Sequence, residues 1–86
     1  MEKIKIKKEY KLNVYENYVK LKTTSGHEWI TPINGTFESI QDYFFKDRFN
    51  VGDYPDEIME RVTNLDVYEK NTNDTILIAS FQNQQI

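Results

Sequence analysis

The chain has 86 residues, a net charge of −3, 38% hydrophobic residues and 29% charged residues. This length suits one small domain, and the composition excludes collagen, low-complexity chains and disulfide scaffolds. No apolar run approaches the roughly 18 residues that a membrane-spanning helix needs. We therefore expect a single domain over residues 1–81, followed by a disordered tail over residues 82–86.

The residue inventory excludes several classes of chemical site. Without cysteine, the chain has no thiolate nucleophile, redox dithiol or cysteine-ligated metal centre. The single histidine, His27, precludes a multi-histidine metal site, and the three glycines are too far apart for a phosphate-binding loop. Ser25 lies near His27 at a predicted turn, but the pair lacks an orienting acid and an oxyanion site. We expect no enzymatic activity, no metal and no cofactor.

The composition also bears on location and origin. Residues 1–10 are rich in lysine but lack the apolar stretch of a secretory signal. Together with the lack of cysteine, this predicts a cytoplasmic protein. The heavy use of Lys, Ile, Asn, Tyr and Glu is typical of AT-rich genomes and suggests a bacterium, a phage or another mobile element.

The first third of the chain predicts an antiparallel meander of three strands. Apolar side chains alternate from Ile4 to Val14, which indicates a strand. A two-residue turn at Glu16-Asn17 would place Val14 opposite Val19 in a hairpin.

A second two-residue turn, at Ser25-Gly26, would lead into the third strand. This turn pairs Leu21 with Ile30 and Lys22 with Trp29. The indole would then lie on the outer face of the sheet, beside the lysines.

The middle of the chain predicts two helices. Thr36 can cap a first helix, whose apolar stripe begins at Phe37 and which should end near residues 50–52. Pro55 suits the first position of a second, short helix. The apolar residues that would pack this second helix are Ile58, Met59 and Val62.

The last third predicts a hairpin, because alternation at residues 65–67 and an apolar run at residues 76–79 flank a turn cluster at residues 71–74. The element order is β-β-β-α-α-β-β. We expect an α+β fold in which an antiparallel sheet, a three-stranded N-terminal meander plus a C-terminal hairpin, packs against one or two helices.

Charge is divided unevenly along the chain. Residues 1–22 hold seven lysines and three glutamates, a net charge of +4, whereas residues 38–60 hold seven acids and two bases, a net charge of −5. Such a division produces a dipolar surface that steers charged partners. Each charged region is therefore a separate candidate surface.

The acidic region is the first candidate. A rigid row of carboxylates on the predicted helices could imitate nucleic-acid phosphates and occupy the basic groove of another protein, and a solvated acidic face is the plainer alternative. Phe45 and Phe49 point away from the core stripe, so they are either buried under residues 50–62 or exposed as anchors. The predicted partner-binding residues are Glu38, Asp42, Phe45, Asp47, Phe49, Asp56, Glu57 and Glu60.

The outer face of the N-terminal sheet is the second candidate. Lysines interleave with aromatic residues there, as in platforms that stack bases and follow the phosphates of single-stranded nucleic acid. A solvated face with lysine tips in water is the alternative. The residues of this face are Lys11, Tyr15, Tyr18, Lys20, Lys22 and Trp29.

These features predict a small non-enzymatic protein-binding module, an inhibitor or adaptor, whose acidic helical face binds a protein with a basic surface. The alternative is a nucleic-acid-binding domain that uses the sheet face. We expect no membrane association, and a monomer or weak homodimer, because Lys3, Lys5 and Lys7 would protect the edge of the first strand.

Overall fold

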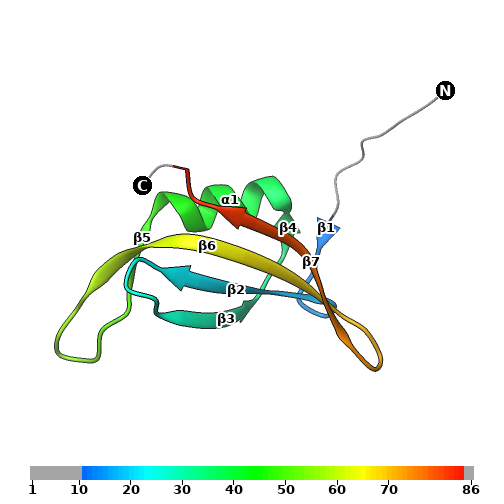
Figure 1. The fold of residues 1–86 in the computed structure, drawn as a ribbon, viewed down its shortest axis with the longest axis horizontal. Coiled ribbons are helices and arrows are strands. Elements are labelled where there is room, and N and C mark those ends of the chain that lie inside the picture. The colour runs from blue at the N-terminus through cyan, green and yellow to red at the C-terminus, as the bar shows by residue number, and fades with distance from the viewer. Residues whose placement is uncertain (1–10, 85–86) are drawn as a thin grey trace.

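The computed structural model describes residues 11–84 as an antiparallel sheet that one helix covers on one face (Figure 1). The elements are β1 (Lys11–Leu12), β2 (Asn17–Thr23), β3 (Glu28–Pro32), β4 (Gly35–Thr36), α1 (Phe37–Lys46), β5 (Arg48–Asn50), β6 (Met59–Lys70) and β7 (Thr75–Gln82). The α+β class is confirmed. The predicted order β-β-β-α-α-β-β is wrong, because α1 is the one helix among the described residues.

Strand β6 is the centre of the sheet. It pairs with β2 along one side, and with β5 and β7, so that the main order is β3-β2-β6-β5 with β7 also on β6. The short strands β1 and β4 form a separate two-stranded ribbon. None of the helical structure in residues 11–84 is long and apolar enough to cross a membrane.

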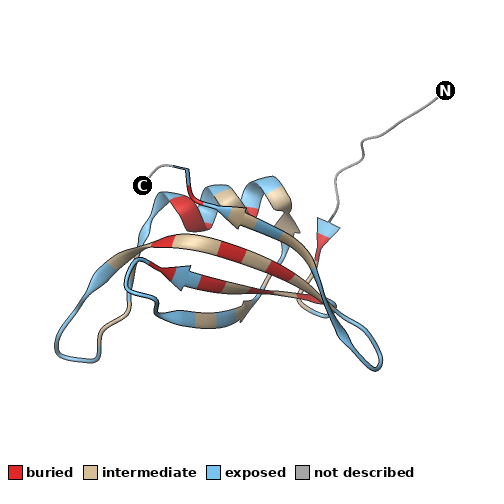
Figure 2. Ribbon diagram, in the orientation of Figure 1, coloured by how far each residue is buried: buried red, intermediate tan, exposed pale blue. Residues whose placement is uncertain are grey.

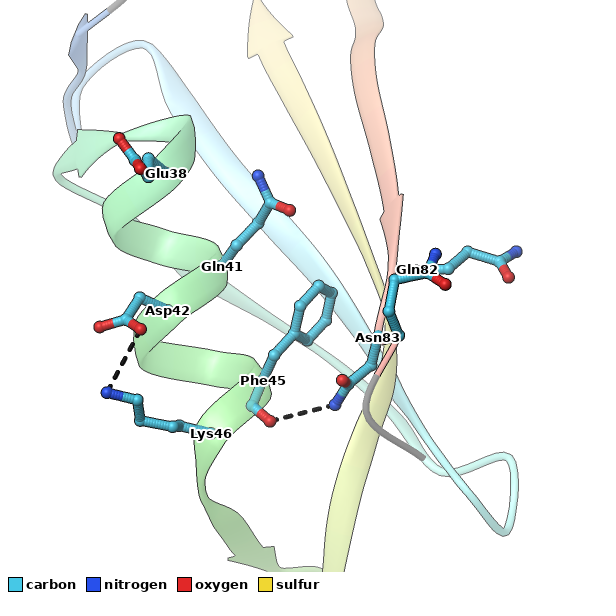
Figure 3. Close-up of a pocket in the computed structure, with 8 residues that line it drawn as sticks. Glu38, Gln41, Asp42, Phe45, Lys46, Gln82 and Asn83 are labelled. Carbon is cyan, nitrogen blue, oxygen red and sulfur yellow. Dashed lines mark hydrogen bonds and ion pairs between the residues drawn. The ribbon is translucent and has the colours of Figure 1, made fainter.

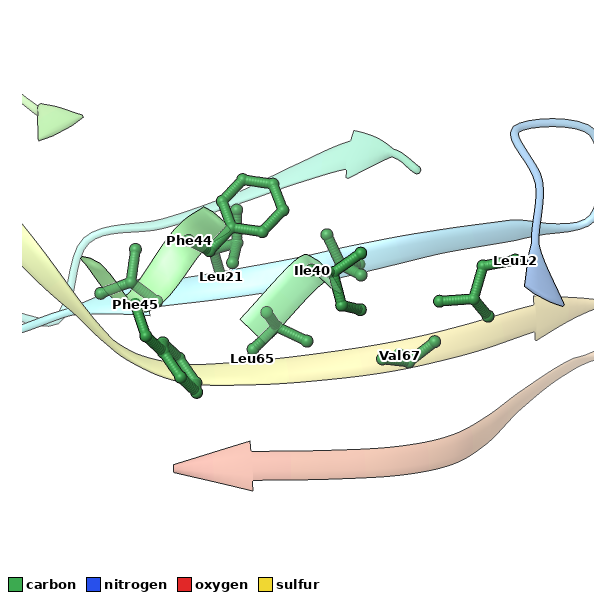
Figure 4. Packing of buried hydrophobic residues seen from close by; sticks show 9 residues of the cluster. Leu12, Leu21, Ile40, Phe44, Phe45, Leu65 and Val67 are labelled. Carbon is green, nitrogen blue, oxygen red and sulfur yellow. The ribbon is translucent and has the colours of Figure 1, made fainter. Parts of the chain in front are cut away.

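The core lies between α1 and the inner face of β2 and β6 (Figures 2 and 4). Alternate residues of β2 point to this face, as do Leu65 and Val67 of β6, whereas Val62 joins them across an irregularity in the β2–β6 ladder. Helix α1 contributes the apolar residues of its sheet-facing side. The buried apolar residues are Leu12, Val19, Leu21, Ile40, Phe44, Phe45, Val62, Leu65 and Val67.

The start of α1 is fixed by a capping box. The hydroxyl of Thr36 accepts a hydrogen bond from the amide of Ser39, and the hydroxyl of Ser39 accepts one from the amide of Thr36. The predicted cap and the predicted start of this helix are therefore confirmed. The helix ends at Lys46, earlier than residues 50–52, because the chain enters β5 at Arg48.

The predicted second helix does not form. Residues 51–58 make a loop, and the chain from Met59 onward is strand β6. The apolar residues Ile58, Met59 and Val62 fit a helical spacing, but Met59 instead lies opposite Asn50 in the β5–β6 ladder. Strand β6 pairs with β5 at its start and with β2 and β7 along the rest of its length, and this tertiary pairing overrides the local pattern.

The predicted first hairpin is also wrong. The turn lies at residues 13–16, where the side chain of Asn13 accepts hydrogen bonds from the amides of Tyr15 and Glu16. Leu12 then lies opposite Gly35 of β4 rather than opposite β2. Residues 4–10 of the predicted strand, and the lysines at its predicted edge, lie outside the described residues.

The β2–β3 hairpin exists, but its register differs by one residue from the prediction. The amide of Thr23 donates to the carbonyl of His27, so three residues rather than two form the loop, and Gly26 takes a positive φ of 94°. Leu21 therefore lies opposite Trp29, not opposite Ile30. A one-residue shift exchanges faces, so the indole faces the helix and Ile30 faces outward.

The C-terminal hairpin matches the prediction in its turn and extends further. Strand β7 includes Gln82, and Asn83 is buried, so the disordered tail does not begin at residue 82. The amide nitrogen Nδ2 of Asn83 donates to the carbonyls of Phe45 and Val62, at 3.1 and 2.9 Å. These bonds tie the residue that follows β7 to the last turn of α1 and to β6. Residues 85–86 lie outside the described residues.

Candidate functional site

A groove lies between the outer side of α1 and the end of β7 (Figure 3). Its volume is about 300 Å³. Three residues that the sequence analysis assigned to a binding surface, Glu38, Asp42 and Phe45, converge here. The remaining lining residues are Gln41, Lys46, Gln82, Asn83 and Gln84.

The groove combines an apolar base with a charged rim. Phe45 is buried, and its ring projects from α1 toward β7 (Figure 3). Asp42 forms an i,i+4 ion pair with Lys46, with 3.3 Å between Oδ1 and Nζ. Within the described residues, the carboxylate of Glu38 has neither a hydrogen bond nor an ion pair. The rim thus offers one free carboxylate and one that lysine neutralises in part.

Amide side chains form the wall opposite the helix. Gln82 is exposed, and the buried Asn83 holds this wall against the helix through its bond to the Phe45 carbonyl. On the helix side, Gln41 donates from Nε2 to the carbonyl of Phe37. The geometry suits the side chain of a lysine or arginine, whose methylenes can lie on a ring while its cationic tip meets carboxylates and amide oxygens.

The other predicted acids are not brought together with this groove. Asp47 is the exposed C-cap residue of α1, and Asp56 and Glu57 are exposed in the loop over residues 51–58. The predicted continuous acidic helical row therefore does not exist. The acids instead lie on the helix surface and on a separate loop.

Glu60 differs from the other acids because hydrogen bonds from the β2–β3 turn engage its carboxylate at the surface of the fold. The hydroxyl of Thr23 donates to it at 2.6 Å, and the hydroxyl of Ser25 donates at 2.8 Å. These bonds lower the pKa of the Glu60 carboxyl, with Thr23 the larger cause. Glu60 fastens the β2–β3 turn to β6, which gives it a structural position and removes it from the exposed acidic surface.

Phe49 and Trp29 form an aromatic cluster on the inner face. Their ring centroids are 5.8 Å apart, and Phe49 also contacts the rings of Tyr43 and Phe44. A shallow cavity of about 270 Å³ lies beside them, lined also by His27 and Asn50. Phe45 is buried and Phe49 packs against the core, so of the two alternatives for these rings the structure shows burial and not exposed anchors.

The outer face of the sheet keeps only part of the predicted nucleic-acid platform. Tyr18, Lys20 and Lys22 do share this face, with Tyr18 stacked on Tyr68 at 5.1 Å. Trp29, the strongest predicted stacking group, lies on the opposite face. The lysines also face acid: Nζ of Lys20 and Nζ of Lys22 each lie 4.0 Å from the carboxylate of Glu28.

The last two residues of the predicted platform lie apart from it. Lys11 is exposed on β1, which pairs with β4 in the separate ribbon. Tyr15 is exposed in the turn before β2.

The sequence analysis did not assign the other five groove residues to a binding surface, because the groove forms only where the end of β7 meets α1. These residues are Gln41, Lys46, Gln82, Asn83 and Gln84. Of the five, only Lys46 gave a signal in the sequence, because it lies four residues after Asp42.

Among residues 11–84, no three His, Asp or Glu side chains are grouped so as to hold a metal ion. Comparisons of the chain with protein-family models, with curated proteins and with solved structures found no match.

Proposed function

We propose that this chain is a non-enzymatic protein-binding module that takes a basic side chain of its partner into the groove between α1 and β7. The observation that carries the proposal is the convergence of Glu38, Asp42 and Phe45 on one groove of about 300 Å³. An adaptor or an inhibitor could use such a site.

Electrostatics support a basic partner. Glu38 and Asp42 of α1 lie at the groove, the loop over residues 51–58 adds exposed acids elsewhere on the molecule, and the chain carries −3 overall. Such a field raises the association rate of a positively charged partner. The acids stand on two separate elements, so the proposal is recognition of basic side chains rather than imitation of a phosphate backbone.

A titration tests this proposal with a defined probe. A tetra-arginine peptide is added to the ¹⁵N-labelled protein, and a tetra-citrulline peptide of the same shape serves as the uncharged control. We expect the arginine peptide to shift amide signals of α1 and of residues 82–84, and the shifts to weaken with salt. Citrulline should leave them unchanged.

Matched variants separate the groove from the general negative field. Replacing both Glu38 and Asp42 by their amides (E38Q/D42N) should weaken peptide binding about three- to tenfold, since an exposed ion pair contributes roughly 0.2–1 kcal/mol. The same charge change in the loop, D56N/E57Q, should weaken it less. Equal effects of the two double variants would show that only net charge matters and would contradict a groove site.

A single-stranded oligonucleotide serves as the competing probe. Binding that perturbs Tyr18 and Tyr68 and leaves the groove signals unchanged would favour the sheet face over the groove. This outcome would overturn the proposal that the groove is the binding site.

A further inference from the structure

Strand β7 is an edge strand of unusual composition. It pairs with β6 on one side, and no other strand of the described residues lies along its second side. Its eight residues, from Thr75 to Gln82, include no charged residue, no proline and no glycine. Natural edge strands usually carry charge, proline or a bulge to prevent pairing with another chain; β7 has one irregularity, at Ile78, but neither charge nor proline.

The opposite edge shows that protection. Strand β3 is shorter, with five residues, and carries Glu28 at its start and Pro32 at its end. Proline cannot donate to a ladder, and a charged side chain on an edge strand opposes pairing with another chain. The edges formed by β3 and β7 are therefore chemically unlike, and of these two only β7 is free of charge and proline.

The backbone of β7 offers hydrogen-bonding groups along its free side. The amide of Asn83 donates to the carbonyl of Thr63 and therefore points toward β6. Successive backbone amides of an antiparallel strand point to opposite sides, so the amides of Ser80 and Gln82 point away from β6, toward the free edge.

Apolar side chains reinforce this edge. Ile76 and Leu77 of β7 are 44% and 51% exposed. The register places Leu77 opposite Tyr68, and Tyr68 opposite Tyr18, so an apolar row crosses the uncovered face and ends at β7. A neighbouring strand would extend this row and cover Leu77.

We propose that a second copy of this chain pairs with β7 in antiparallel fashion about a two-fold axis, to form one continuous sheet through two molecules. A second β7 is compatible in charge, because both strands are uncharged and pairing them buries no unpaired charge. It is also matched in shape. The ladder with β6 is irregular at Ile78, and a symmetry-related strand carries the same irregularity and therefore the same added twist.

Sedimentation velocity over a range of concentrations, supported by light scattering, tests the proposal on the full chain. We expect a reversible monomer–dimer equilibrium. Leu77→Lys places an ammonium group at the pairing edge, and should raise the dissociation constant of the dimer at least about tenfold, a change of 1.4 kcal/mol. Ile30→Lys, a matched change at a 60% exposed residue of the β3 edge, should leave the constant unchanged.

A spin label gives a second readout, since the chain has no cysteine of its own. Ser80→Cys carries a label on β7, and Thr31→Cys carries one on β3. The dimer should show a short inter-label distance for Ser80, within a few strand spacings of roughly 4.8 Å each. The distance for Thr31 should be much longer. A monomer at every concentration, a dimer that Ile30→Lys disrupts, or a short distance at Thr31 would each overturn the proposal. None of these outcomes bears on arginine-peptide binding by the groove.

Discussion

Leu21 of β2 and Trp29 of β3 lie opposite each other, and this pairing decides which face of the sheet the indole occupies. Leu21 is fully buried beneath α1, so Trp29 must lie on the same, helix-covered face. There it contacts the rings of His27 and Phe49. The only tryptophan of the chain therefore stabilises the fold and is turned away from the open face of the sheet.

Removal of the indole should destabilise the protein. We expect Trp29→Ala to lower the free energy of unfolding by about 2 kcal/mol, less than for a fully buried ring because Trp29 is half-buried. Urea denaturation followed by far-ultraviolet circular dichroism measures this change. The neighbouring Ile30→Ala, on the open face, should change it by less than about 0.5 kcal/mol. A larger effect at Ile30 than at Trp29 would contradict the observed register.

Asn83 should be necessary for stability although it follows the last strand. Its Nδ2 satisfies two carbonyls, those of Phe45 and Val62, in a buried position. Asn83→Ala leaves these acceptors without this donor, which should cost about 1–3 kcal/mol in chemical denaturation. Gln84→Ala, one residue further at an exposed position, is the matched control and should have little effect. Equal stability of the two variants would show that the bridge contributes nothing.

Glu60 should make the free energy of unfolding depend on pH in the acidic range. Hydrogen bonds from Thr23 and Ser25 lower the pKa of its carboxyl in the folded state. Folding therefore favours the ionised carboxylate. The stability that this carboxylate contributes is fully present above the pKa of Glu60 in the unfolded chain, and it is lost as the pH falls through the lower pKa of the folded protein. The difference in unfolding free energy between the wild type and Glu60→Gln should therefore shrink below about pH 4.5. Urea titrations at several pH values measure it.

A control for this prediction is Glu57→Gln, which removes one negative charge from the exposed loop. Its carboxylate makes no hydrogen bond within the described residues. If Glu57→Gln reproduces the acid dependence of Glu60→Gln, then the loss of a charge, and not the bonds to Thr23 and Ser25, is responsible.

The cap of α1 should also be measurable. Thr36→Ala removes the hydroxyl that accepts from the amide of Ser39, and should destabilise the protein by about 1 kcal/mol. Thermal or urea denaturation can resolve this difference. Thr24→Ala, at an exposed turn position, provides the comparison and should be close to neutral. A neutral Thr36→Ala would mean that the capping box adds no stability here.

Local signals were sufficient to predict the start of α1, because its cap and its apolar stripe agree, but they did not predict its end at Lys46. They were also sufficient for the faces of β2, where Val19 and Leu21 point inward and Lys20 points outward. The signals failed where the chemistry depends on loop length. Ser25-Gly26 reads equally well as a two-residue or a three-residue turn, and one residue of difference moved Trp29 to the other face.

Only three of the eight groove residues were predicted from the sequence. Glu38, Asp42 and Phe45 were recognised from helical spacing and charge, which are local properties. Asn83 and its neighbours were not, because nothing in the sequence near residue 83 indicates that the chain returns to the end of α1. The place of Glu60 was missed for the same reason, since its partners Thr23 and Ser25 lie more than thirty residues away along the chain.

The position of β6 has a consequence for how the protein is made. Strand β2 and helix α1 leave the ribosome before β6, although both pack against it (Figure 1). Until Met59–Lys70 has emerged, the core lacks Val62, Leu65 and Val67, so the apolar faces that include Val19, Leu21 and Ile40 are incompletely buried. Folding that depends on such distant partners is slow and leaves nascent chains prone to association. Chains that end before Met59 should therefore be captured by chaperones or degraded, whereas chains that extend past Asn83 should fold in one cooperative step.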